Sequence, residues 1–196
     1  MKIYIASQNQ DKIREIASVL DNDVSLLSVL ELGLKNELPE TGKTLTANAL
    51  QKARFIYEKF GVDCFADDTG LEVEALDGAP GVYSARYAGE QKNSKDNMRL
   101  LLKNLIGVAN RKACFKTVIA LLICGKEYIF EGEVNGTIAH DPVGEKGFGY
   151  DPVFLPEGNT KTFAEMTLQE KNKISHRARA VEKLSQFLNV NKNLFS

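Results

Sequence analysis

Residues 45–74 read LTANALQKARFIYEKFGVDCFADDTGLEVE and pass from a helical pattern into a strand pattern. Apolar side chains recur at helical spacing and predict one buried stripe, made of Leu45, Ala49, Ala53, Ile56 and Phe60. Gly61 predicts the end of that helix. A buried strand is expected next, ending at the turn-like residues 67–70, with a further short strand at 71–74. A helix that leads directly into a buried strand is typical of α/β proteins.

The same alternation continues on both sides of this stretch. The expected elements are a strand at 2–6, a helix capped by Asn9 with Ile13, Ile16, Ala17 and Leu20 on one stripe, a helix capped by Ser94, a hairpin of 113–124 and 126–138 through Gly125, a capping box at 167–170 and a helix at 175–190. Two segments rich in glycine and proline, 77–89 and 141–156, predict long structured loops of the kind that usually carry function. The sequence therefore predicts one α/β domain over residues 1–196, with a mixed sheet.

Composition excludes several classes of protein. The chain is 43% hydrophobic, and its 25 Lys+Arg against 26 Asp+Glu give a net charge of −1, so no basic stripe for nucleic acid is expected. No apolar run reaches the ~18 residues of a membrane span, and the N-terminus lacks a signal-peptide core, which predicts a cytoplasmic protein. Cys64, Cys114 and Cys124 lie in apolar stretches and predict buried, reduced thiols. With two histidines in all, a metal site would need oxygen ligands, which favours Mg²⁺ or Mn²⁺.

Two segments in the first third of the chain carry candidate phosphate and metal chemistry. Residues 7–12 join a strand to a helix N-terminus, which suits an anion, and Lys12 adds a full charge there. Read alone, this segment is better explained as an ordinary capped helix with a solvated lysine. Asp67 and Asp68 close an apolar strand and could bind a hard cation with Glu40, or could form an ordinary turn.

Two later segments carry candidate chemistry for a planar base. Phe148 and Tyr150 stand among three glycines at 144–149 and could stack on a flat ring, or could pack in the core. The run from Lys171 to Arg179 could gather hydrogen-bond donors, or could be a solvated basic face. The four segments together supply the parts of an enzyme that acts on a nucleotide phosphate.

Five motifs, in order along the chain, resemble those of the inosine/xanthosine triphosphate pyrophosphatases. They are Ser7–Lys12, Ala66–Leu71, Gly78–Tyr87, Gly147–Pro152, and Lys171 with Ile174–Arg177. The resemblance covers the chain from its N-terminus to its last helix. It implies a two-lobed α/β fold around a long mixed sheet with flanking helices, an active-site cleft between the lobes, a homodimer and a magnesium requirement.

The resemblance also implies hydrolysis of dITP, ITP and XTP to the monophosphate and pyrophosphate, with a role for each matching residue. Asp68 would be the catalytic carboxylate and a metal ligand, with Glu40 as the second ligand. The substrate would be bound by Ser7, Gln8, Asn9, Gln10, Asp11, Lys12, Lys52, Thr69, Phe148, Gly149, Tyr150, Asp151, Lys171, His176 and Arg177. We expect Asp67 to share the task of proton acceptor with Asp68, because burial would raise the pKa of Asp67.

Three positions depart from the family pattern. Gln8 replaces the usual glycine, Thr69 replaces serine but keeps the hydroxyl, and Ala47 replaces a glutamate near the expected metal. The sequence leaves two alternatives open. One is a Maf-like pyrophosphatase for pyrimidine or modified nucleotides, and the other is a regulator that binds a nucleotide without cleaving it.

Overall fold

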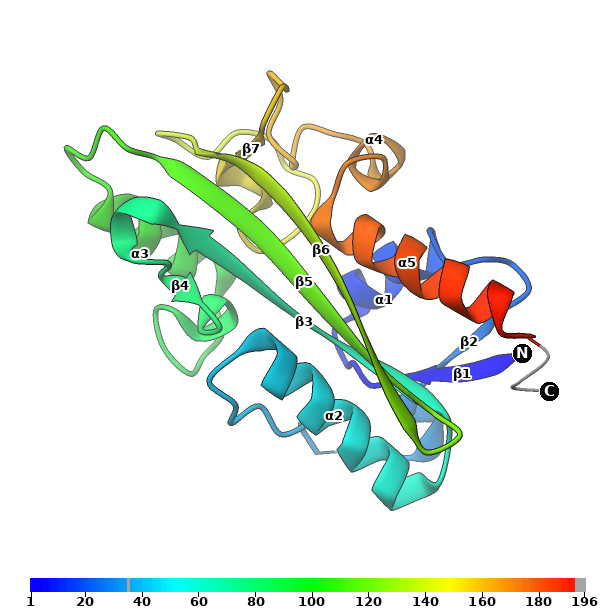
Figure 1. Ribbon diagram of the computed structural model, residues 1–196. Helices are drawn as coiled ribbons and strands as arrows, with labels where there is room; N and C mark the ends of the chain where they lie inside the picture. The colour runs from blue at the N-terminus through cyan, green and yellow to red at the C-terminus, as the bar shows by residue number, and fades with distance from the viewer. Residues whose placement is uncertain (35, 193–196) are drawn as a thin grey trace. The chain divides into compact units, whose positions relative to one another are not determined.

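The strands form a mixed sheet in a computed structural model that describes residues 1–34 and 36–192 (Figure 1). The strands are β1 (Lys2–Ile5), β2 (Ser25–Ser28), β3 (Cys64–Val73), β4 (Pro80–Gly81), β5 (Lys112–Ile123), β6 (Lys126–Ile138) and β7 (Phe154–Pro156). They pair in the order β2-β1-β3-β5-β6-β7, with β4 on β3. Because β1 is parallel to β2 and β3 while β4 and β7 pair antiparallel, the sheet is mixed, as predicted.

Among the described residues, five α-helices accompany the sheet. They are α1 (Gln10–Ala17), α2 (Leu45–Phe60), α3 (Ser94–Asn104), α4 (Leu168–Asn172) and α5 (His176–Val190). None of the helices among the described residues is long and apolar enough to cross a membrane. The chain divides into two compact units: unit 1 is Met1–Asp68, Thr117–Gly132 and Arg177–Ser196, and unit 2 is Thr69–Lys116 and Glu133–His176.

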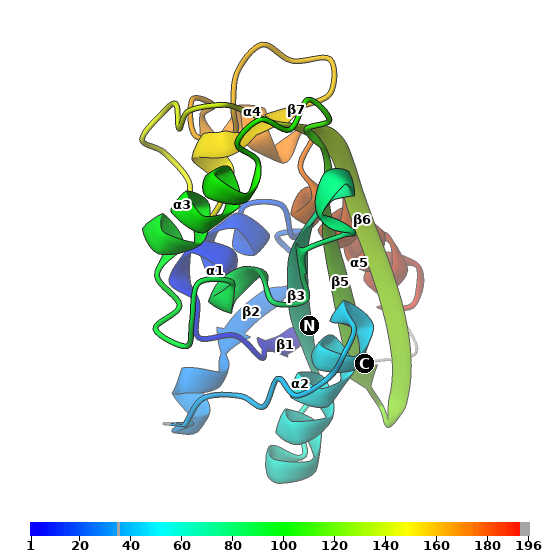
Figure 2. The same ribbon diagram turned by 90° about the vertical axis from the view of Figure 1, so that its left-hand side faces the viewer.

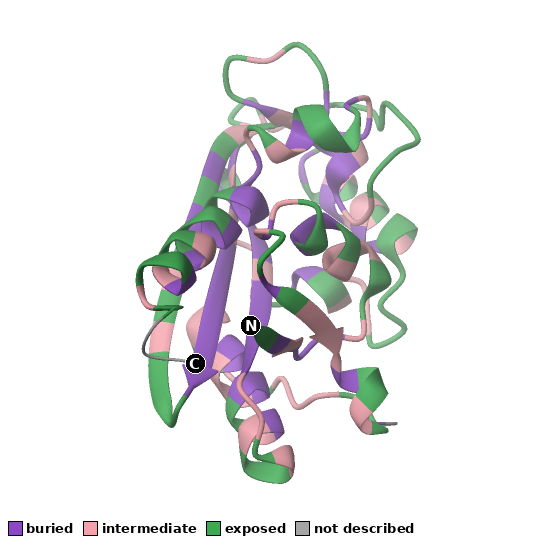
Figure 3. Ribbon diagram, turned by 90° about the vertical axis from the view of Figure 1, so that its right-hand side faces the viewer, coloured by how far each residue is buried: buried purple, intermediate pink, exposed green. Residues whose placement is uncertain are grey.

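In unit 1, both faces of the sheet are covered by helices. Alternate residues of a strand point to opposite faces, so Cys64 and Ala66 of β3 pack with the stripe of α2, while Phe65 packs with α1 and α5. Residues 118–123 of β5 alternate in the same way. Figure 2 shows α2 alongside β3 and β5, and Figure 3 shows the buried stretches of these strands in purple.

The core of unit 2 is built on the aromatic side chains of the sheet and of the following loops. The Phe115 and Phe154 rings meet edge to face at 4.7 Å, and Phe163 lies 5.3 Å from Phe154. Leu101 of α3 and Leu105, the residue after the end of α3, complete this cluster.

β3 is one continuous strand, so the expected break at residues 67–70 is wrong. Asp and Gly have low strand propensity and read locally as a turn. Here the neighbouring strands hold this segment extended, and lysine side chains meet the two carboxylates. Tertiary pairing therefore overrides the local signal.

Other local predictions divide into confirmed and wrong. The Asn9 cap, the whole span of α2 with its Gly61 stop, the hairpin and the capping box at Thr167 are confirmed. The cap of α3 is Asn93 rather than Ser94, because the Asn93 side chain accepts from two backbone amides.

Two predictions of burial are also wrong. On α1, Ala17 was expected on the buried stripe but is exposed. Glu15 is buried instead, and Arg177 pairs with its carboxylate. All three cysteines are free, but only Cys64 is buried, and desolvation raises the pKa of its thiol to about 12. Cys114 is half-buried, and Cys124 is exposed at the tip of the hairpin because it forms the turn with Gly125.

Candidate active site

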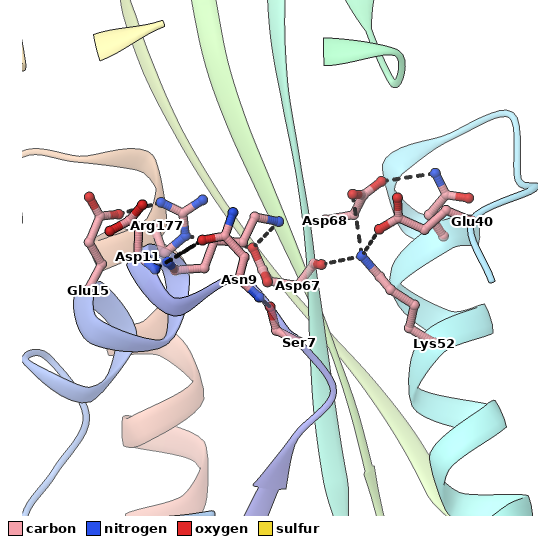
Figure 4. A network of polar contacts seen from close by, with 11 residues as sticks. Ser7, Asn9, Asp11, Glu15, Glu40, Lys52, Asp67, Asp68 and Arg177 are labelled. Atoms are coloured by element: carbon pink, nitrogen blue, oxygen red, sulfur yellow. Dashed lines mark hydrogen bonds and ion pairs between the residues drawn. The ribbon is translucent and has the colours of Figure 1, made fainter. Parts of the chain in front are cut away.

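One half of the polar cluster in unit 1 lies on the α2 side of β3 (Figure 4). Lys52 of α2 places its Nζ 2.5 Å from Glu40 Oε1, 2.7 Å from the carbonyl oxygen of Asp67 and 3.5 Å from Asp68 Oδ1. Asn48, one turn earlier on α2, donates from Nδ2 to Asp68 Oδ2 at 3.1 Å. Burial works against the charge of Lys52, but the three carboxylates of Asp68, Glu40 and Asp67 outweigh it and raise the pKa of the ammonium. The buried side chain of Lys52 is therefore positively charged and lies among these carboxylates.

The other half of the cluster lies on the opposite side of β3. Asp67 Oδ2 is 3.0 Å from Lys12 Nζ of α1 and 3.6 Å from Arg177 Nε of α5, and the Asp67 side chain is fully buried. Arg177 also pairs through Nη1 with the carboxylate of Glu15. Figure 4 shows Asp67 and Asp68 directed away from each other. Strand alternation thus sends the two neighbouring carboxylates to opposite faces, and they do not converge on one point.

The two aspartates have opposite pKa shifts. Burial opposes ionisation of Asp67, but Lys12, Arg177 and Lys52 outweigh it and hold the pKa of that carboxyl well below its usual range. Burial acts on the pKa of Asp67 in the expected direction, but the three cations reverse it, so the expected rise of that pKa is wrong. At Asp68 burial dominates over the attraction of Lys52 and Lys12, and the pKa of that carboxyl is raised. Asp68 is the better proton acceptor of the two on this ground.

Glu40 and Asp68 are the residues of the cluster that could hold a magnesium ion. Both carboxylates contact Lys52 Nζ, and repulsion from Glu40 adds to the effect of burial in raising the pKa of Asp68. Burial works against ionisation of Glu40, but Lys52 lowers its pKa and keeps it charged. Mg²⁺ is commonly held by one or two carboxylates together with substrate phosphates, and a donor set of this kind fits that mode.

The turn from β1 into α1 is held by its own polar side chains. Asn9 Oδ1 accepts from the backbone amides of Asp11 and Lys12 at 3.0 and 3.1 Å, and Ser7 Oγ accepts from the amide of Asn9. Gln8 donates to the carbonyl oxygen of Asn36. Since the cap already uses two of the amides, the positive charge at this turn comes mainly from Lys12, whose side chain is 17% exposed. Gln10 begins the helix and is exposed.

Unit 2 brings together most of the residues expected to contact the base. Lys171 Nζ and Asp151 Oδ2 form a buried pair at 2.5 Å, and the amide of Phe148 donates to the same Asp151 oxygen at 2.9 Å. Lys171 Nζ also lies 5.2 Å from the centre of the half-buried Phe148 ring. The buried ion pair of Asp151 and Lys171 therefore anchors the segment 147–151.

Other residues expected to bind the substrate are buried in the core of unit 2 or belong to unit 1. Tyr150 is buried in the core of unit 2, and its hydroxyl donates to the carbonyl oxygen of Ser84 at 2.8 Å. His176 is buried and stacks on Phe115 at 4.5 Å. Arg177 belongs to unit 1, and half-buried Thr69 is the first residue of unit 2.

The basic run at the end of the chain separates into two groups. Lys171, His176 and Arg177 are buried, while Lys173 and Arg179 are exposed. The buried residues are thus the ones that could act as hydrogen-bond donors in a site. The exposed ones form a solvated basic face, the other interpretation of this run.

Glu15, Asn48 and Ser84 are buried and polar, and none of them was predicted as a site residue. Asn48 had a local signal, because it stands four residues before Lys52 and next to the apolar stripe of α2. Glu15 lies beside Ile16 on α1, but only its distant partner Arg177 explains its burial. Ser84 accepts from the amide of Leu71 and donates to the carbonyl oxygen of Gly81, contacts that no local pattern indicates.

Comparison with known proteins places this arrangement in a family. The family model described as the Ham1 family matches residues 3–187. A curated dITP/XTP pyrophosphatase of Flavobacterium johnsoniae is 52% identical over 192 residues, which is 98% of this chain and 100% of that protein. One of Porphyromonas gingivalis is 53% identical over 188 residues, 95% of this chain and 97% of that protein.

Solved structures agree with the sequence relatives. The Staphylococcus aureus Ham1 protein superposes with a TM-score of 0.87 at 39% identity, covering 97% of this chain and 100% of its own. A HAM1 protein from Coxiella burnetii gives 0.88 at 38% identity, covering 96% and 98%. The mixed sheet with flanking helices is therefore shared with these structures. By family model, relatives and fold, the chain belongs to the Ham1 family.

Proposed function

We propose that this protein hydrolyses the non-standard purine nucleoside triphosphates dITP, ITP and XTP to the monophosphate and pyrophosphate. The observation that carries the proposal is the group of Asp68, Glu40 and Lys52, two carboxylates on one buried ammonium. The relatives named dITP/XTP pyrophosphatase, which match nearly the whole chain, support the choice of substrates. Removal of these nucleotides from the cytoplasmic pool would be the outcome of the reaction.

The mechanism follows from the charges around Asp68. Lys52 and Lys12 supply fixed positive charge for the phosphates, and both pair with carboxylates that hold them in place. Asp68, with its raised pKa, accepts the proton of the attacking water as the bond between the α- and β-phosphates breaks. Glu40 and Asp68 would hold Mg²⁺, which when bound neutralises phosphate charge and lowers the pKa of water.

Base selection would rest on the donors of unit 2. Lys171 can only donate hydrogen bonds, and hypoxanthine and xanthine offer a 6-oxo acceptor where adenine has an amino group. Asp151 keeps that ammonium in place from a buried position. A mismatch that leaves a buried donor unpaired can give roughly 10⁴-fold discrimination, which supports rejection of ATP.

The test is a substrate panel with magnesium, in which pyrophosphate and orthophosphate are measured separately for dITP, ITP, XTP, GTP, ATP and dTTP. Pyrophosphate from the first three substrates alone is the expected result. Orthophosphate would contradict attack at the α-phosphate. A preference for dTTP would favour the Maf-like alternative, and binding of ITP without release of any product would favour the regulator.

The same proposal includes a magnesium requirement, with manganese as a substitute, and a homodimer. The resemblance to the family supports both, and residues 77–89 are the segment expected at the dimer contact. A loss of turnover in EDTA that Mg²⁺ restores would support the metal requirement. Light scattering on the purified protein is expected to give twice the 21.7 kDa mass of the chain.

A further inference from the structure

Asn48 joins two separate segments of the candidate active site. Its Oδ1 accepts from the backbone amide of Gly42 at 2.7 Å, and its Nδ2 donates to Asp68 Oδ2 at 3.1 Å. The side chain starts from α2 and is 1% exposed as a residue. One amide group thus spans the distance between the loop that carries Glu40 and the strand that carries Asp68.

The partners of Asn48 leave its amide one orientation. The backbone amide of Gly42 can only donate, so it must meet the oxygen of the side chain. An ionised Asp68 can only accept, so it must meet the nitrogen. Asp68 Oδ2 is therefore taken by Asn48, and Asp68 Oδ1 is the oxygen that faces Lys52 at 3.5 Å.

Gly42 lets the loop approach α2 closely. A Cβ atom at this position would lie 2.7 Å from the Cβ of Ala47 and 2.8 Å from Asn48 Oδ1, distances that real Cβ contacts do not reach. The bond from the Gly42 amide to Asn48 holds the loop beside α2 two residues after Glu40, whose carboxylate is itself held by Lys52. Asn48 consequently contacts one candidate metal ligand directly, Asp68, and links it to the loop that carries the other.

We propose that Asn48 is a positioning residue that orients Asp68 for catalysis and metal binding. This inference rests on the proposed function. Groups that orient a metal ligand without touching the metal commonly change metal affinity or activity by 10–100-fold when they are replaced. Asn48 has the geometry of such a group.

The experiment compares Asn48→Leu with Gln51→Leu. Leucine has the branched shape of asparagine and is one atom shorter than glutamine, and it removes the polar atoms of both side chains. Gln51 is a matched control because it stands on the same helix and fastens the same loop, with two hydrogen bonds of 2.9 Å to Thr41. Both of those bonds go to the residue next to Glu40 and neither goes to Asp68. Asn48→Ser is the second variant, used if Asn48→Leu does not show a cooperative thermal unfolding transition.

We expect kcat for dITP to fall by about 10–100-fold in the Asn48 variant, with KM within about threefold of wild type. The affinity for Mn²⁺, measured by electron paramagnetic resonance without nucleotide, should weaken by a similar factor. Gln51→Leu should stay within about threefold in both measurements. Equal losses in the two variants, or an unchanged kcat and Mn²⁺ affinity in Asn48→Leu, would overturn the proposal.

The two readouts separate this inference from the proposed function. If the wild-type protein releases no pyrophosphate from dITP, the proposed function fails. The Mn²⁺ affinities of the wild type and the variants still test the positioning role in that case. A weaker Mn²⁺ affinity in Asn48→Leu alone supports the role, and an unchanged one contradicts it.

Discussion

At the scale of single residues, Asp67 and Asp68 show how a one-residue step along a strand reverses the chemistry of a carboxylate. Burial dominates at Asp68 and raises its pKa, which suits a proton acceptor. We expect Asp68→Asn to lower kcat by about 10²–10⁴-fold, the usual contribution of a general base. The free energy of unfolding should change little, because burial already disfavours the charge of Asp68. Pyrophosphate release and urea unfolding measure the two effects, and a variant that keeps most of the wild-type rate would remove Asp68 from the mechanism.

Asp67→Asn should mainly lower the free energy of unfolding, whereas Asp68→Asn should mainly lower kcat. The variant leaves Lys12 and Arg177 facing a neutral side chain, and breaking a buried ion pair typically costs about 3–5 kcal/mol. The lowered pKa of Asp67 makes this contribution full above the unfolded pKa near ~3.9, and it is lost as the pH falls toward the folded value. Urea unfolding of both proteins should therefore show a large stability difference at pH 6 that shrinks below about pH 4. A difference that does not depend on pH would contradict the charge assignment.

At the scale of elements, the sequence predicted what local patterns determine. The stripe of α2, its stop at Gly61 and the Gly125 hairpin each depend on residues a few positions apart, and all three are confirmed. The continuity of β3 through Asp67–Gly70 depends on strands far away in the chain and was missed. The split of Asp67 and Asp68 between two faces follows from that continuity. Because the sequence predicted a turn at residues 67–70, it did not predict that strand alternation places the two side chains on opposite faces.

The loop at residues 147–151 offers a test at the same scale through two glycines. Gly147 and Gly149 both have positive φ, at 71° and 63°, so alanine is strained at either position by about 1–2 kcal/mol. A Cβ at Gly147 would also overlap the Asp151 carboxylate, whereas a Cβ at Gly149 meets nothing within 4 Å. We expect Gly147→Ala to destabilise the protein clearly more than Gly149→Ala in urea unfolding. Equal losses would mean that Asp151 moves freely and that its pair with Lys171 does not fix the loop.

At the scale of the whole molecule, the junctions between the two units could not be predicted from sequence. They fall at 68/69, 116/117, 132/133 and 176/177. The first three lie inside β3, β5 and β6, and the fourth lies in the first turn of α5. No composition change marks a boundary at these positions, because an uninterrupted strand or helix has the same pattern on both sides. The neighbours His176 and Arg177 therefore read as one basic cluster in the sequence but belong to different units.

These junctions predict that the two units unfold together. If either unit unfolded alone, β3, β5, β6 and α5 would each have to break inside a continuous hydrogen-bonded element, which favours a single transition. Leu184 in unit 1 and Phe163 in unit 2 are fully buried, and alanine at either position should cost roughly 3 kcal/mol or more. Each variant should therefore lower one common calorimetric midpoint by about 6–12 °C. Two resolved peaks, with each variant shifting only the peak of its own unit, would show that the shared elements do not couple the units.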